Sequence, residues 1–224
     1  MPLAGPEPVA LAILAKAPVP GRVKTRLCPP CTPHQAAAIA AASLADTVLV
    51  AGATPASRRT LAIHGEYPAP AGWQVVAQRG DGLAERLAHA FADAAPDGQP
   101  TILIGMDTPQ VSVADQVAVA DGLDRADAVL GLAADGGWWT LALRDPLQAQ
   151  VLVDVPMSTV DTGELTLKAL RGRGLAVAVG QSLRDVDTAE DAWAVAAAHP
   201  YGAFAAAVRT HLRSSSAAVT QVVR

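Results

Sequence analysis

The stretch VALAILAKAPVPGRVKTRL, residues 9–27, joins a short apolar run to a loop rich in positive charge. Residues 9–15 are apolar and are bounded by turn-forming residues, which is typical of a strand buried on both faces. Pro18, Pro20 and Gly21 exclude a regular helix or a central strand in the segment that follows. The stretch therefore predicts a buried strand that ends in a stiff, basic loop.

Further short apolar runs alternate with helical patterns along the rest of the chain. Strands that alternate with helices predict a mostly parallel sheet covered on both faces. Thr32, followed by Pro33 as the first helical residue, is expected to cap the first helix. We expect strands at 60–64, 73–78, 101–106, 126–133, 138–143 and 175–180, and helices at 33–51, 82–95, 112–124, 162–171 and 188–198.

Composition limits the class of protein. A length of 224 residues suits one α/β domain, and a content of 51% hydrophobic and 17% charged residues argues against disorder. The net charge of −4 gives no sign of attraction to nucleic acid or to a membrane. Two cysteines imply no disulfide framework, and no signal peptide is evident, so we expect a cytoplasmic protein. We expect a single domain over 1–211 and a flexible tail over 212–224.

Charged residues follow several of the expected strands, and ligands of such sheets bind where strands end. Asp107 follows the run at 101–106, and Asp135 follows the run at 126–133. Asp187 lies beyond the last strand. If these strands are parallel, the three carboxylates meet the basic loop at one edge of the sheet. That combination suits a ligand rich in phosphate, bound together with a divalent metal ion.

The basic loop carries Lys16, Arg22, Lys24 and Arg26, which can neutralise the phosphates of a nucleotide. Backbone N–H groups of a turn containing glycine add fixed donors. The alternative is a solvated loop whose charges aid solubility. The loop lacks the spaced glycines and the Lys-Ser/Thr ending of a Walker A motif.

Asp107 is the first candidate metal ligand, because Mg²⁺ and Mn²⁺ prefer oxygen donors. It could instead cap the following helix, although Ser112 is better placed for that role. Asp185 and Asp187 precede a helix that Thr188 is expected to cap, and one of the two carboxylates could be the second ligand. We assign this role to Asp187.

The motif ADGGWW, residues 134–139, is the candidate acceptor site. Gly136 and Gly137 permit a positive φ or a close approach of the backbone to a ligand, and Asp135 is a candidate general base for an acceptor hydroxyl. Trp138 can stack on a sugar. An ordinary turn between two strands is the alternative. Ser158 and Thr159 are further acceptor candidates, in a segment that can also serve only to cap a helix.

Five motifs together resemble the bacterial glycosyltransferase-A-like family of the nucleotide-diphospho-sugar transferase superfamily, over about residues 9–199. They are AKAPVPGRVKTRL, IGMDTPQV, ADGGWWTLALR, VPMSTVDTG and RDVDTAED. The resemblance implies an α/β fold, a Rossmann-like three-layer α/β/α sandwich of the glycosyltransferase-A type. It also implies a divalent metal on Asp107 and a nucleotide pocket at the first loop. The expected nucleotide-binding residues are Ala15, Lys16, Ala17, Pro18, Gly21, Arg22, Lys24, Arg26 and Asp81.

Three functions are compatible with these residues. The first is glycosyl transfer from a nucleotide-diphospho-sugar to a small acceptor, with Mg²⁺ or Mn²⁺ on Asp107 and Asp187, Asp135 as base and Lys24 stabilising the departing diphosphate. The second is nucleotidyl transfer from an NTP to a phosphorylated small molecule, with release of pyrophosphate. The third is a nucleotide-binding module without turnover. We expect a monomer or a homodimer, with no nucleic acid or membrane as partner.

Overall fold

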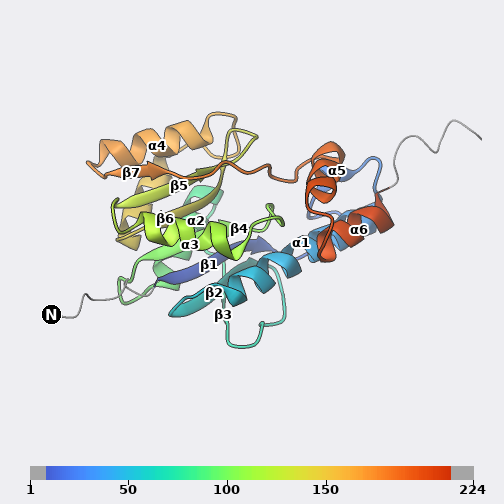
Figure 1. Ribbon diagram of the computed structural model, residues 1–224, viewed down its shortest axis with the longest axis horizontal. Helices are drawn as coiled ribbons and strands as arrows, with labels where there is room; N and C mark the ends of the chain where they lie inside the picture. The colour runs from blue at the N-terminus through green and yellow to red at the C-terminus, as the bar shows by residue number, and fades with distance from the viewer. Residues whose placement is uncertain (1–8, 213–224) are drawn as a thin grey trace, which may run out of the picture.

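A computed structural model describes residues 9–212 and contains one seven-stranded sheet (Figure 1). The order of the strands is β3-β2-β1-β4-β6-β5-β7. All neighbours are parallel except β6, which runs antiparallel to both β4 and β5. The expected mostly parallel sheet is therefore confirmed. The strands are β1 (Ala10–Lys16), β2 (Arg58–His64), β3 (Gln74–Ala77), β4 (Thr101–Gly105), β5 (Ala128–Leu132), β6 (Trp138–Leu143) and β7 (Val177–Val179).

The antiparallel direction of β6 follows from the short turn before it. Only residues 133–137 separate β5 from β6, and a parallel crossover needs about a dozen residues or more. Because β6 is reversed, its first residue lies at the same edge of the sheet as the carboxyl ends of its neighbours. The ADGG turn therefore reaches the edge at which β1 and β4 end.

Helices cover both faces of the sheet. On one face, α1 (Pro33–Ala53) and α3 (Val113–Gly122) share a core with side chains of β1 such as Leu11 and Ile13. On the other face lie α2 (Leu83–Ala94), the 3₁₀ helix η2 (Pro146–Asp154) and α4 (Thr162–Gly172), which share a core with Ala12 and Leu130. The alternation of buried side chains along β1 thus builds the expected three layers.

Helix α1 begins where the sequence predicts. The Thr32 side chain accepts a hydrogen bond from the backbone N–H of Gln35 (3.3 Å), and the Gln35 side chain accepts one from the N–H of Thr32 (2.8 Å). By length and composition α1 could cross a membrane. Eight of its residues are buried, and it packs between the sheet and α6, so the apolar sequence is accounted for by a helix of the core.

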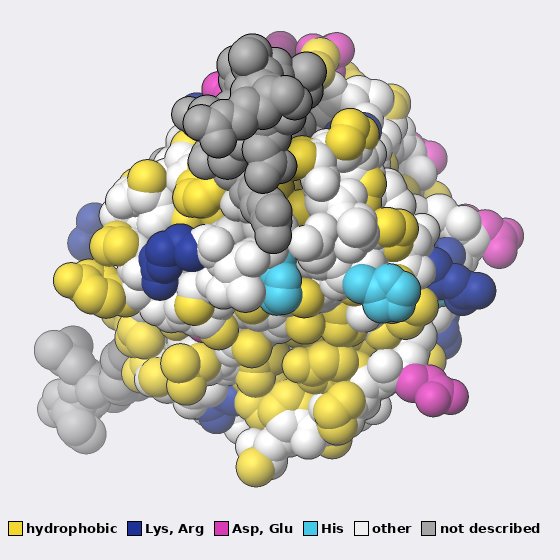
Figure 2. Space-filling view, turned by 90° about the vertical axis from the view of Figure 1, so that its right-hand side faces the viewer, with side chains coloured by type: hydrophobic (Ala, Val, Ile, Leu, Met, Phe, Trp, Pro, Cys, Tyr) yellow, Lys and Arg dark blue, Asp and Glu magenta, His cyan; other side chains and the backbone are white. Residues whose placement is uncertain are grey.

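Two C-terminal helices, α5 (Ala189–Ala198) and α6 (Ala203–His211), form a lobe beside the first half of α1 (Figure 1). Figure 2 views the end of the molecule at which this lobe lies, where apolar side chains cover much of the lower half. The sequence did not predict α6. Its start is held by Asp46 of α1, which accepts hydrogen bonds from the backbone N–H groups of Ala203 (3.0 Å) and Phe204 (2.8 Å). Leu212 of the expected tail is buried against this lobe, and residues 213–224 lie outside the described residues.

Replacing Asp46 by alanine is expected to destabilise the protein by about 1–2 kcal/mol, as the loss of a helix cap does. The melting temperature should fall by roughly 2–8 °C. Asp46→Asn keeps one acceptor oxygen, so its loss of stability should be less than half that of Asp46→Ala. Thermal unfolding followed by circular dichroism measures both variants, and an unchanged melting temperature for Asp46→Ala would contradict the role of this contact.

Candidate functional site

A cleft of about 500 Å³ opens at the edge of the sheet where β1, β3 and β4 end. Its walls come from the basic loop, the segment at 78–86 and the residues that follow β4. The volume lies within the range of small-molecule sites. Among the residues proposed from the sequence, those that line the cleft are Ala15, Lys16, Arg22, Lys24, Arg26, Asp81, Asp107, Ser158 and Asp187.

Other candidates lie beside this cleft rather than in its lining. Ala17 is buried behind the basic loop, and Gly21 forms a turn of the loop with a φ of 76°. Ser158 reaches the cleft from a backbone with a φ of 61°, while its neighbour Thr159 does not line it. The candidates outside the lining are Ala17, Pro18, Gly21, Asp135, Gly136, Gly137, Trp138 and Thr159.

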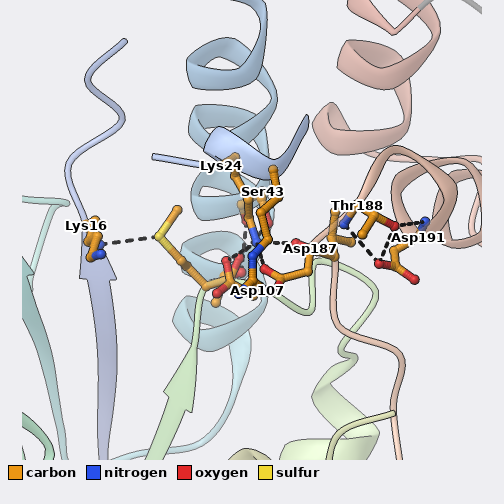
Figure 3. A network of polar contacts seen from close by, with 11 residues as sticks. Lys16, Lys24, Ser43, Asp107, Asp187, Thr188 and Asp191 are labelled. Carbon is orange, nitrogen blue, oxygen red and sulfur yellow. Dashed lines mark hydrogen bonds and ion pairs between the residues drawn. The ribbon is translucent and has the colours of Figure 1, made fainter. Parts of the chain in front are cut away.

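Lys24 is the centre of the polar network in the cleft (Figure 3). Its Nζ lies 2.7 Å from Oδ1 of Asp107 and 3.8 Å from Oδ1 of Asp187, and it donates a hydrogen bond to the carbonyl of Val186. The Lys24 side chain is only 6% exposed. The backbone N–H of Val186 also donates to the carbonyl of Asp107 (2.8 Å), so the segments that carry the two carboxylates are held together. Three segments far apart in the sequence thus meet at one ammonium group.

The remaining basic residues of the loop differ in their partners. Nη1 of Arg26 lies 2.5 Å from Oδ2 of Asp187, so both oxygens of that carboxylate face cations. Lys16 and Arg22 line the cleft and form no ion pair with another residue of the described range 9–212. Their charges are therefore available to an anionic ligand.

Gln78 and Arg86 also line the cleft and were missed by sequence reasoning. Nε2 of Gln78 donates to the carbonyls of Ala15 (2.7 Å) and Ala62 (3.0 Å), which ties the segment after β3 to the ends of β1 and β2. Nε of Arg86 donates to the carbonyl of Gly80 (3.1 Å). No motif marks these two residues. The signal that could have found Gln78 is its place at the end of an expected strand.

Three carboxylates form an acidic cluster next to the cleft. Asp135, Asp185 and Asp187 have oxygen atoms that all lie within 4.8 Å of one another. This set of oxygen donors fits Mg²⁺ or Mn²⁺. Asp107 is not part of the cluster, because its carboxylate faces Lys24. The expected pairing of Asp107 with Asp187 on a metal stays a prediction. Asp187 belongs both to the acidic cluster and to the residues that contact Lys24.

Burial raises the pKa of Asp185 to about 6, and the neighbouring charge of Asp135 adds to the effect. The hydrogen bond to its own backbone and the charge of Lys24 act in the opposite direction. The Asp185 carboxyl group therefore takes up a proton at a higher pH than an ordinary aspartate does.

This shift predicts how the stability of the metal-free protein depends on pH. The folded protein binds a proton at Asp185 more tightly than the unfolded chain, so this group stabilises the fold at low pH, and the stabilisation is lost as the pH rises through about 6. With EDTA present, Asp185→Asn should be more stable than the wild type at pH 7.5 by about 1 kcal/mol after allowance for solvent screening, or roughly 2–4 °C. The difference should shrink as the pH falls through about 6 and vanish below pH 3.8, the ordinary pKa of an aspartate. Parallel melting curves across this pH range would contradict the shift.

The ADGG turn packs against the loop that precedes α4. The carbonyl of Gly136 accepts a hydrogen bond from the N–H of Gly163 (2.8 Å), and the N–H of Gly137 donates to Oδ1 of Asp135 (2.7 Å). Trp138 and Trp139 point to opposite faces of the sheet, as expected, and Trp139 belongs to the core beneath α1 and α3. The structure therefore brings the turn close to the segment that carries the other acceptor candidates.

A family model described as "Uncharacterized protein conserved in bacteria (DUF2064)" matches residues 35–159, more than half of the chain. The chain belongs to this family. The DUF2064 match includes Asp107 and Asp135, whereas Lys24 lies before it and Asp187 lies after it. No curated protein sequence matches the chain.

Solved structures show which fold this DUF2064 protein shares. A protein of Desulfovibrio desulfuricans G20, named provisionally as a nucleotide-diphospho-sugar transferase, is 24% identical, with a TM-score of 0.79 over 90% of this chain and 95% of its own. Rv0371C of Mycobacterium tuberculosis H37Rv, in complex with manganese, is 20% identical, with a TM-score of 0.53 over 84% and 98%. The 2-C-methyl-D-erythritol 4-phosphate cytidylyltransferase of Thermus thermophilus is 13% identical, with a TM-score of 0.56 over 87% and 100%. These likenesses confirm the expected Rossmann-like α/β/α fold.

Proposed function

We propose that this DUF2064 protein is a transferase that binds a nucleotide through its phosphate groups and transfers part of it to a small acceptor. One observation carries the proposal. Cations of the first loop and carboxylates of later segments meet in a single cleft, where Lys24 contacts both Asp107 and Asp187. Phosphate groups need the cations, and a divalent metal needs the carboxylates. We further propose that the protein is cytoplasmic and acts as a monomer or a homodimer.

The residues of the cleft divide into two functional groups. Lys16 and Arg22 have no carboxylate partner among residues 9–212, so they are suited to neutralise phosphate oxygens. Asp187, together with Asp135 and Asp185, would hold Mg²⁺ or Mn²⁺, which when bound supplies charge neutralisation at the departing phosphate. The structural relative solved with manganese supports the use of such a cation.

Glycosyl transfer from a nucleotide-diphospho-sugar is the reaction that we favour. An acceptor hydroxyl must lose a proton, and a carboxylate can take it up as a general base. In this reaction Asp135 is our proposed base, and the other two carboxylates of the cluster, Asp185 and Asp187, would hold the metal. The likeness in fold to the Desulfovibrio protein, at a TM-score of 0.79, supports this choice.

Nucleotidyl transfer is a second candidate, and the position of Asp135 favours it. That carboxylate accepts a hydrogen bond from Gly137 and lies among the candidate metal ligands, so it is less free to act as a base. A phosphorylated acceptor is already ionised and needs no base. The Thermus thermophilus cytidylyltransferase has the same fold.

A thermal-shift screen of nucleotide sugars and NTPs, each with and without Mn²⁺, tests binding. A ligand present at about 100 times its dissociation constant should add roughly 2.7 kcal/mol of stability, and Mn²⁺ should increase the gain. Lys24→Ala should abolish most of the shift. Arg58→Ala is the matched control, because it removes a positive charge that pairs with Asp97 and does not line the cleft. Equal shifts in both variants would contradict the proposed site.

Product analysis then identifies the bond that breaks. Release of a nucleoside diphosphate from a nucleotide sugar indicates glycosyl transfer, and release of pyrophosphate from an NTP indicates nucleotidyl transfer. Binding without turnover on hydroxyl or phosphate acceptors would leave a nucleotide-binding module and would overturn the transferase proposal.

A further inference from the structure

The ammonium group of Lys24 is surrounded by oxygen atoms. It contacts Oδ1 of Asp107 at 2.7 Å, Oδ1 of Asp187 at 3.8 Å and the carbonyl of Val186. The lysine side chain is 6% exposed, whereas the side chains of Asp107 and Asp187 are 50% and 35% exposed. The cation thus lies deeper than either carboxylate and occupies the space between two segments (Figure 3).

Asp187 is needed by two kinds of cation at once. Its two oxygens face Lys24 and Arg26, and one of them also lies within 4.8 Å of carboxylate oxygens of Asp135 and Asp185. A divalent ion bound to this cluster would lie close to the Lys24 ammonium and would be repelled by it in a partly buried site. Lys24 and a divalent ion therefore cannot both bind the Asp187 carboxylate as tightly as either would alone.

We propose that Lys24 acts as an internal occupant of the metal site in the free protein. Its ammonium holds carboxylate oxygens that a divalent cation needs, and it leaves them when a phosphate group of the nucleotide draws it away. This inference rests on the proposed function, which supplies the metal and the nucleotide. The nucleotide draws Lys24 away from the carboxylates that the metal needs, and the metal frees Lys24 to bind the nucleotide. Each ligand should therefore increase the affinity of the protein for the other.

Binding of Mn²⁺ in the absence of nucleotide, measured from the electron paramagnetic resonance signal of free Mn²⁺, tests the competition. Lys24→Met should bind Mn²⁺ at least about tenfold more tightly than the wild type, since a close unit charge is removed. Lys16→Met is the matched control. It removes the same charge from the same cleft but has no carboxylate contact within residues 9–212, and it should change the dissociation constant less than about threefold.

Arg26→Met should fall between these two variants. Arg26 also contacts Asp187, but its side chain is 72% exposed and is screened by solvent. The proposal is overturned if Lys24→Met binds Mn²⁺ no more tightly than Lys16→Met.

A second measurement needs no substitution and so avoids any variant that fails to fold. The chain has three lysines, Lys16, Lys24 and Lys168, which tryptic peptides can separate. In the free protein Lys24 should resist acetylation by an N-hydroxysuccinimide ester, while the exposed Lys16 and Lys168 react. Saturating Mg²⁺ should increase the acetylation of Lys24 several-fold and leave the other two unchanged. Continued protection of Lys24 at saturating Mg²⁺ would overturn the proposal.

The outcomes separate this inference from the proposed function. If neither the wild type nor any variant binds Mn²⁺, with or without nucleotide, both the metal-dependent transferase and the lysine exchange are wrong. If the wild type and Lys24→Met bind Mn²⁺ equally and transfer requires the metal, the exchange is wrong and the proposed function stands.

Discussion

Asp187→Asn is expected to lower the rate of transfer by about 10²–10³-fold, which is typical of removing one group that stabilises charge in a transition state. Asp187 is the residue on which the two charged groups of the site converge. It faces Lys24 and Arg26, and it completes the acidic cluster with Asp135 and Asp185. The substitution removes its negative charge and one of its two acceptor oxygens, so both the cations and the metal lose a partner.

The stabilisation of Asp187→Asn by nucleotide should also lose most of its dependence on Mn²⁺. Turnover on the substrate found by screening, and thermal shifts with and without Mn²⁺, measure the two effects. Asp124→Asn is the matched control, since it neutralises an exposed aspartate outside the cleft and the acidic cluster. The role of Asp187 is refuted if both variants keep the turnover and the Mn²⁺ dependence of the wild type.

Gly136→Ala is expected to lower the melting temperature by roughly 4–16 °C, corresponding to about 2–4 kcal/mol of strain and displacement. Gly136 has a φ of 91°, and a Cβ atom at this position would lie 1.9 Å from the carbonyl oxygen of Val160. That carbonyl belongs to the backbone, so relief requires the whole loop before α4 to move. The acceptor candidates Ser158 and Thr159 are part of this loop.

Gly98→Ala separates the cost of the backbone angle from the cost of the clash. Gly98 has a φ of 74°, and a Cβ atom there would meet nothing within 4 Å. Gly98→Ala should therefore lose only about 1–2 kcal/mol of stability. Thermal unfolding compares the two variants, and nucleotide titration of Gly136→Ala should still show donor binding while transfer falls. Equal losses of stability would mean that the turn does not depend on its contact with Val160.

Local signals explain why most elements could be predicted. The caps at Thr32, Ser112 and Thr188 all form the reciprocal hydrogen bonds that define helix starts, and each lies within a few residues of its partner. Helix α6 has no such signal, because Gly202 offers no side chain and its first N–H groups bind Asp46 of a distant helix. Its residues were therefore left without a predicted element.

In the candidate site, too, some features could be predicted from the sequence and others could not. The sequence indicated that Lys24, Asp107 and Asp187 would meet, because each follows a predicted strand, and the structure places the lysine in contact with both carboxylates. The sequence did not indicate that Lys24 would be buried between them, or that Asp135 would cluster with Asp185 and Asp187 while Asp107 faces Lys24. Those arrangements depend on side-chain directions and on how the segments pack against one another.

By itself the amino-acid sequence determined the alternation of strands and helices, the starts of α1, α3 and α5, and the edge of the sheet at which charged residues gather. Those properties follow from hydrophobic periodicity and from hydrogen bonds between near neighbours in the chain. Only the tertiary structure decided that Lys24 occupies the oxygens of Asp107 and Asp187, that Asp46 caps α6, and that three aspartates share one space. Each of these contacts joins segments distant in the sequence, and the relative placement of such segments is decided by packing.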